Sequence, residues 1–178
     1  MNIFVTNPDP QVSAKVLPDK HIVKMPLETC QMLSIVFSHW YYDWGDDLVK
    51  KKDGTAYKTS KGAFRNHPCT QWAADSMYNT AWLIQHGCAL VYEYNHRYNK
   101  IHGCANALFE AKKTFHRMTN TAIVCYSMVD HFTRAMPDVY KYDTSIDTFT
   151  AYKNYIGSKP WVASNYLRDP SRKPHWIE

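Results

Sequence analysis

Several patterns that would classify a protein at once are missing from this 178-residue sequence. No apolar run approaches the roughly 20 residues needed to span a bilayer, and residues 1–5 lack a signal-peptide pattern. The five cysteines are odd in number and never form a C-x-x-C pair, which argues against a disulfide framework and against a zinc knuckle. The nine histidines show no H-E-x-x-H spacing, so no metal or other cofactor is expected. These absences predict a soluble cytoplasmic protein with reduced thiols and no membrane partner.

The composition is that of a folded globular chain. Hydrophobic residues make up 45% and aromatic residues 15% of the sequence, which excludes a disordered chain. A chain of this length fits one domain, here residues 1–178, and can bury a substantial core without disulfide or metal staples. The net charge of +5 permits a polyanionic partner without requiring one.

Hydrophobic periodicity predicts a mainly α-helical protein. A short extended segment at 2–6 ends at a turn with two prolines, and Asp9-Pro10 is typical of a helix start. Residues 41–66 hold three glycines, a run of three lysines and little periodicity, so we expect a long basic loop there. The expected helices cover 10–17, 19–40 with a kink at Pro26, 68–98 with an interruption near Gly87, 104–118, 122–135, 146–155 and 161–166.

The segment 19–28 gathers five ionisable residues at the start of a helix. His21 and Glu28 are seven positions apart, which aligns them on one face of a 3.6-residue helix, with Lys24 beside them. The opposite side carries an apolar stripe of Val23, Leu27 and Cys30. The polar line formed by His21, Lys24 and Glu28 has two interpretations. It is either a solvated helix face or, if a pocket covers it, a set of groups for acid/base and electrostatic catalysis.

This segment resembles the corresponding helix of the small phage pyrimidine-dimer DNA glycosylases of the endonuclease V type. In that family an Asp-x-His is followed, seven residues after the His, by a catalytic Glu; here those residues are Asp19, His21 and Glu28. Residues 66–69 and the Pro- and Trp-containing pieces at 159–161 and 174–176 resemble further parts of the family in a looser way.

The resemblance implies a compact single-domain helical bundle of the endonuclease V type. It implies a phage enzyme that flips a pyrimidine out of double-stranded DNA and cleaves its glycosidic bond, with no cofactor. Glu28 would be catalytic, stabilising positive charge on the sugar, while His21 and Lys24 orient the phosphate or the sugar oxygen. A phage gene would place the protein in the cytoplasm of an infected bacterium.

One difference from the family bears on mechanism. The family's nucleophile is the α-amine of a Thr exposed by removal of the initiator Met, whereas residue 2 here is Asn2, a poor context for that removal. With Met1 retained, water activated by Glu28 is the simplest nucleophile, which would give a monofunctional glycosylase. Two alternatives stay open: a transferase that modifies a flipped pyrimidine such as 5-hydroxymethyluracil, and a catalytically silent DNA-binding or host-interaction protein.

Basic residues interleaved with aromatic residues predict the DNA-binding surface, because phosphates set affinity and ring faces receive an unstacked base. Trp72 is a candidate for stacking on an unpaired base, although a Trp at helical spacing is also typical of a hydrophobic core. His67 stands at a helix start, where neighbouring N–H groups favour an anion. The candidate DNA-binding residues are Lys51, Lys58, Lys61, Arg65, His67, Trp72, Arg97, Lys100, His102, Arg172, Lys173 and Trp176.

Overall fold

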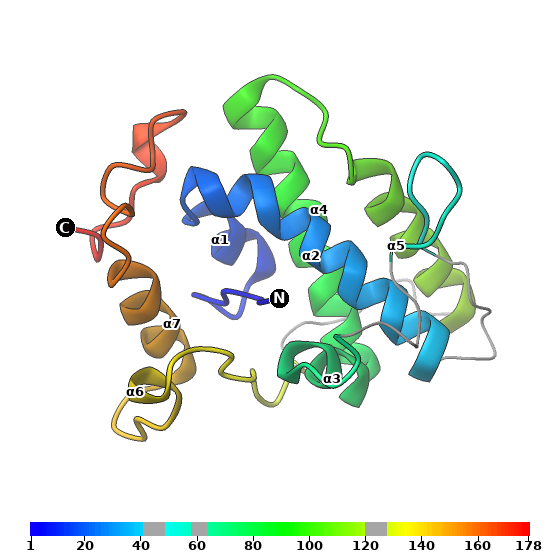
Figure 1. Ribbon diagram of the computed structural model, residues 1–178, viewed down its shortest axis with the longest axis horizontal. Helices are drawn as coiled ribbons and strands as arrows, with labels where there is room; N and C mark the ends of the chain where they lie inside the picture. The colour runs from blue at the N-terminus through cyan, green and yellow to red at the C-terminus, as the bar shows by residue number, and fades with distance from the viewer. Residues whose placement is uncertain (41–48, 58–63, 120–127) are drawn as a thin grey trace.

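The computed structural model describes residues 1–40, 49–57, 64–119 and 128–178. Those residues form an all-helical arrangement without a β-strand, apart from one isolated bridge between Lys50 and Ala56. The elements, in chain order and with the labels of Figure 1, are α1 (Pro10–Lys15), α2 (Asp19–Ile35), the π-helical turn η1 (Val36–Trp40), α3 (Pro68–Asp75), α4 (Met77–Tyr98), α5 (Ala105–Thr119), α6 (Asp138–Lys141), α7 (Thr148–Gly157) and the 3-10 turn η4 (Pro170–Arg172).

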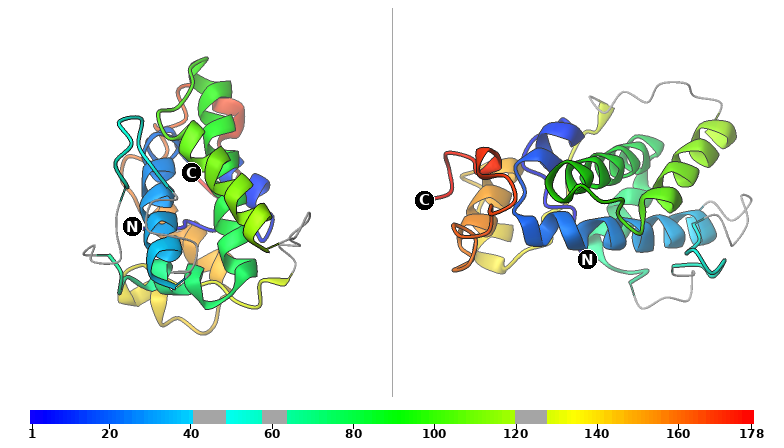
Figure 2. Two further views of the ribbon diagram at one scale, coloured as in Figure 1. Left: turned by 90° about the vertical axis from the view of Figure 1, so that its right-hand side faces the viewer. Right: turned by 90° about the horizontal axis from the view of Figure 1, so that it is seen from above.

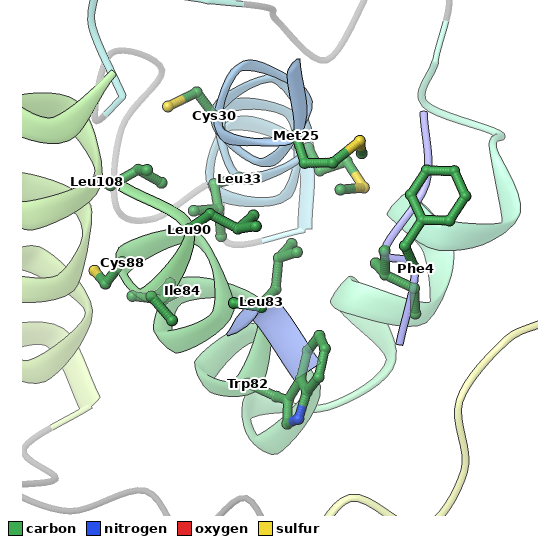
Figure 3. Close-up of a cluster of buried hydrophobic side chains, with 14 of the residues drawn as sticks. Phe4, Met25, Cys30, Leu33, Trp82, Leu83, Ile84, Cys88, Leu90 and Leu108 are labelled. Carbon is green, nitrogen blue, oxygen red and sulfur yellow. The ribbon is translucent and has the colours of Figure 1, made fainter. Parts of the chain in front are cut away.

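Packing of α2 on α4 forms the centre of the molecule, with α1 and α5 also packed on α4. The core between α2 and α4 is apolar, and Figure 3 shows Met25 and Leu33 of α2 near Leu83 and Leu90 of α4. Gly87 allows a close approach of the two helices, because a Cβ atom there would be 2.7 Å from Thr29 Cγ2. Burial of apolar surface from several helices therefore fixes where α2 lies.

Capping residues explain where several helices begin. Asp9 caps α1 by accepting hydrogen bonds from the N–H groups of Gln11 and Val12, and Pro10 follows at the first helical position, as the sequence predicted. Ser76 caps α4 through the N–H of Asn79 and separates α3 from α4. The predicted interruption near Gly87 was wrong, because α4 runs through that glycine without a break.

Two further expected helices need correction, and the structure also places Pro26 and part of the expected loop. Pro26 lies inside α2, as expected, and the helical segment changes to π-helical geometry from Val36 onward. Residues 129–135 of the expected helix at 122–135 are not helical, and residues 161–166 form turns. Within the expected basic loop, 49–57 form a tight turn closed by the Lys50–Ala56 bridge, and the rest of 41–63 lies outside the described residues.

The N-terminal segment (residues 1–6) and the C-terminal third of the chain (residues 128–178) both lie against the first turns of α2. Residues 2–6 are buried, and α7 lies on the far side of this segment (Figures 1 and 2). The start of α2 is tied to the C-terminal third by Asn165, which accepts hydrogen bonds from the N–H groups of Asp19 and Lys20. Chain segments that are remote in sequence therefore enclose one side of α2.

This enclosure bears on the two interpretations of the polar line of α2. Val23 and Leu27 of the apolar stripe are 45% and 41% exposed, whereas His21 and Glu28 of the polar line are buried. The reason is that the N-terminal segment covers the polar side. His21 and Glu28 therefore do not lie on a solvated helix face, whereas Lys24 beside them is exposed.

The four cysteines in the described ranges, Cys30, Cys69, Cys88 and Cys104, are buried free thiols, in agreement with the sequence analysis, and Cys125 lies outside those ranges. No helix among the described residues is long and apolar enough to cross a membrane.

Candidate active site

Glu28 is a buried carboxylate that contacts two cations. Lys24, one turn earlier on α2, places its Nζ 3.1 Å from Oε1, and the α-amine of Met1 lies 3.8 Å from Oε2. The Glu28 side chain is only 10% exposed, whereas that of Lys24 is 69% exposed. The lysine therefore links a buried carboxylate to the molecular surface, where an anion can reach its ammonium group.

Met1 presents its backbone to solvent and not its side chain. The side chain is 1% exposed and packs against the core, yet the residue as a whole is only half-buried. The solvent-accessible part is thus the backbone end that carries the amine. The sequence analysis favoured water as the nucleophile because it assumed that a reactive amine must come from residue 2. The structure instead places the amine of residue 1 beside Glu28.

The N-terminal segment adopts an unusual backbone conformation next to the site. Phe4 has φ of 41°, in the left-handed region that bulky residues rarely enter. Such a conformation costs about 1–3 kcal/mol and persists only where the surroundings hold it. Here the Phe4 ring stacks on His21 at 4.1 Å between centroids and faces Tyr155 at 6.0 Å.

His67 belongs to the same site from a distant part of the chain. Its side chain caps α3, with Nδ1 accepting the N–H of Cys69, so a neutral His67 carries its proton on Nε2. Burial and the positive Met1 amine lower the pKa of His67, while the Glu28 carboxylate opposes this shift. The imidazole is therefore electrostatically coupled to both groups.

His21 is neutral in this site. Burial, followed by the charges of Lys159 and Lys24, lowers the pKa of His21 to about 3. Its Nδ1 atom is buried and has no hydrogen-bond partner among the residues that the structure describes. The ring also meets Trp161 edge-on at 5.7 Å. A neutral imidazole can orient a bound group by hydrogen bonding, but it cannot supply a positive charge at neutral pH.

Asp19, the first residue of the resemblance, has a structural role. Its carboxylate lies 3.1 Å from Arg97 and also accepts the N–H of Arg168. Arg97 is buried and donates further hydrogen bonds to the carbonyl groups of Leu17 and Lys15. This network fixes the start of α2 to α4 and to the C-terminal third, and so fixes the direction of the polar line.

Of the twelve candidate DNA-binding residues, two are removed by the structure. Trp72 is 1% exposed and donates its Nε1–H to the carbonyl of His131, so it is a core residue and not a candidate for stacking on a base. Arg97 is 6% exposed and fully engaged in the network around Asp19. Both belong to the fold, because a buried side chain cannot meet DNA without local unfolding.

The remaining candidates differ in availability. His102 is held by the carbonyl of Val23 and the N–H of Cys104, and Arg172 pairs with Glu93, so both also have structural partners. Trp176 packs partly against the core. The exposed candidates are Lys51, Arg65, Lys100 and Lys173, while Lys58 and Lys61 lie outside the described residues.

Sequence reasoning missed three neighbours of the polar line. The Met1 amine meets Glu28, Trp161 meets His21, and Lys20 stacks its ammonium on Trp161 at 4.4 Å from the ring centroid. No local sequence pattern predicts these contacts, because they join segments far apart in sequence. The cluster of Lys159 and Trp161 in the sequence was the one available signal.

Comparison with known proteins identifies the family of the chain. A family model described as pyrimidine dimer DNA glycosylase matches residues 1–106, which is more than half of the chain. The chain belongs to this family. The match contains Met1, Lys24, Glu28 and His67, and it ends inside α5, so Trp161 and the C-terminal helices lie beyond it. No curated protein and no solved structure matched the chain in the other two comparisons.

Proposed function

We propose that this member of the family is a DNA glycosylase that flips a pyrimidine nucleotide out of duplex DNA and cleaves its glycosidic bond beside Glu28. The observation that carries the proposal is the meeting of a buried carboxylate with an amine and an exposed lysine in one site. A base inside a duplex cannot reach such a site, so extrusion of the nucleotide has to precede the chemistry.

The amine of Met1 is the nucleophile that this arrangement supports. Glu28 accepts a proton from the ammonium group, and the freed lone pair forms a bond to C1′ as the C1′–N bond to the base breaks. The base leaves with the electron pair of that bond and takes up a proton. The nitrogen now carries two protons, and loss of one of them frees a lone pair that expels O4′, which takes up a proton. The product is a protonated imine between Met1 and C1′, the species that borohydride reduces.

The other residues orient the substrate. Lys24 bridges the carboxylate and solvent, where a phosphate next to the flipped nucleotide can pair with it. His67, with its Nε2–H, and neutral His21 offer hydrogen bonds to sugar or phosphate oxygens. Glu28 also stabilises positive charge on the sugar as the glycosidic bond breaks.

The test uses purified protein and duplexes that carry a pyrimidine dimer, uracil, 5-hydroxymethyluracil or an abasic site, with undamaged duplex as control. We expect base release from at least one of these and, with borohydride, a stable protein–DNA adduct that peptide mass spectrometry maps to residue 1. The same mass measurement identifies which residue carries the amine.

Each other outcome argues against a stated part of the proposal. Base release without an adduct would favour water activated by Glu28 over the amine. A mass added to the base would favour the transferase, and salt-sensitive binding without chemistry on any duplex would favour the silent DNA-binding protein.

A further inference from the structure

Asn2 uses both ends of its buried amide group to hold the N-terminal segment. Its Oδ1 accepts hydrogen bonds from the N–H groups of Ile3 at 2.8 Å and Phe4 at 3.1 Å. Its Nδ2 donates to the carbonyl of Ala135 at 2.6 Å, across 133 residues of sequence. The side chain therefore fixes the local turn and also attaches that turn to the segment before α6.

The residues on both sides of Asn2 depend on this attachment. Ile3 is 1% exposed and follows Asn2 into the core, and Phe4 holds its left-handed conformation against the His21 ring. On the other side, the Met1 amine stands one residue from Asn2 and 3.8 Å from Glu28. Asn2 thus connects a strained, well-packed backbone to the amine.

We propose that Asn2 is the positioning residue that holds the α-amine of Met1 against Glu28. The inference rests on the proposed function and deepens it. The Asn in place of the family's Thr is then not the mark of a lost nucleophile. It is a buried anchor that lets the amine of the preceding residue serve the same carboxylate.

The proposal can be tested with two variants that keep a large residue at position 2, so that Met1 is retained. Asn2→Leu keeps the branched shape of the side chain and removes all three hydrogen bonds, whereas Asn2→Asp preserves the acceptor and replaces the donor to Ala135. Asn79→Leu is the matched control, since Asn79 is also buried and donates its amide N–H to a backbone carbonyl, that of Trp72 at 2.7 Å.

The first readout is single-turnover imine formation, measured by borohydride trapping on folded protein. We expect Asn2→Leu to trap about 100-fold more slowly, the loss that a misplaced reacting group causes. Asn2→Asp should fall between Asn2→Leu and wild type, and the Kd for DNA should stay within about twofold, because a positioning residue acts on the reacting group and not on the DNA contacts. Asn79→Leu should trap at the wild-type rate.

The second readout needs no DNA. Reductive methylation of the α-amine with formaldehyde and cyanoborohydride, followed by mass spectrometry of the N-terminal peptide, reports how firmly the amine is held. We expect labelling about tenfold faster in Asn2→Leu and unchanged in Asn79→Leu, because loss of buried hydrogen bonds frees the segment by about that factor. Should Asn2→Leu fail to fold, Asn2→Asp carries both measurements.

Wild-type rates of labelling and trapping in both Asn2 variants would overturn the inference. An adduct mapped to a residue other than Met1 would overturn it as well. A wild-type protein that releases no base from any duplex, with labelling still accelerated in the variants, would instead refute the proposed function and leave the positioning of the amine established.

Discussion

Replacement of Gly87 by Ala tests the packing that places Glu28. A Cβ atom at this position would lie 2.7 Å from Thr29 Cγ2 and 2.9 Å from Leu108 Cδ2, and both neighbours are buried. Overpacking of a core costs about 1–3 kcal/mol, and two such contacts place this site in the upper half of that range. Ala gains about 1 kcal/mol over Gly in a helix interior, so we expect a net loss of about 1–2 kcal/mol.

The assay is urea and thermal unfolding of the purified variants. The expected loss corresponds to a fall in Tm of about 3–6 °C for a chain of this size. Gly157→Ala is the control, because that glycine is the last residue of α7 and its nearest new contact would be Ile177 at 3.8 Å. We expect Gly157→Ala to be as stable as wild type or more stable, by up to about 1 kcal/mol.

A second substitution identifies the cause. Thr29→Ser removes Cγ2, the atom nearest the new methyl group, so the double variant should recover stability relative to the sum of the single changes, with a coupling of about 1 kcal/mol. Because Thr29 follows Glu28 directly, Gly87→Ala should also lower base release. A Gly87→Ala protein as stable as wild type, or additive effects in the double variant, would refute the idea that Gly87 permits the close approach of α2 and α4.

Three further outcomes are expected. Glu28→Gln should lower base release by about 100-fold or more while Lys24→Gln has a smaller effect, and normal turnover by Glu28→Gln would remove the carboxylate from the mechanism. Duplex binding that neutralises about four phosphates should give a slope of log K against log salt of roughly −3.6, so salt-independent binding would count against a DNA substrate. Burial lowers the pKa of His86 to about 3. Below about pH 6.5 the unfolded chain therefore binds a proton at this residue, whereas the folded chain does not. His86 consequently reduces the free energy of unfolding as the pH falls from about 6.5 toward 3. His86→Phe should therefore lessen the loss of unfolding free energy between pH 6.5 and 5, by about 1–2 kcal/mol in urea titrations, and an unchanged pH dependence would show that His86 is not the cause.

Local patterns predicted much of the secondary structure and the alignment of the site on α2. The cap at Asp9 and the helix after Gly103 depend on hydrogen bonds and periodicity within a few residues, and both were confirmed. The seven-residue spacing of His21 and Glu28 likewise follows from helix geometry alone. The break at Ser76 was missed, because the continuing apolar pattern outweighed a single capping residue.

The sequence by itself determined an all-helical chain, a polar line on one helix face and the resemblance that led to the family. Only the tertiary structure decided which side of that helix faces inward. Val23 and Leu27 lie exposed while Glu28 is buried, because the N-terminal segment covers the polar side and supplies the Met1 amine as a partner for the carboxylate. A buried charge requires such a partner, and the partner comes from 27 positions away in the chain, where helical periodicity carries no information.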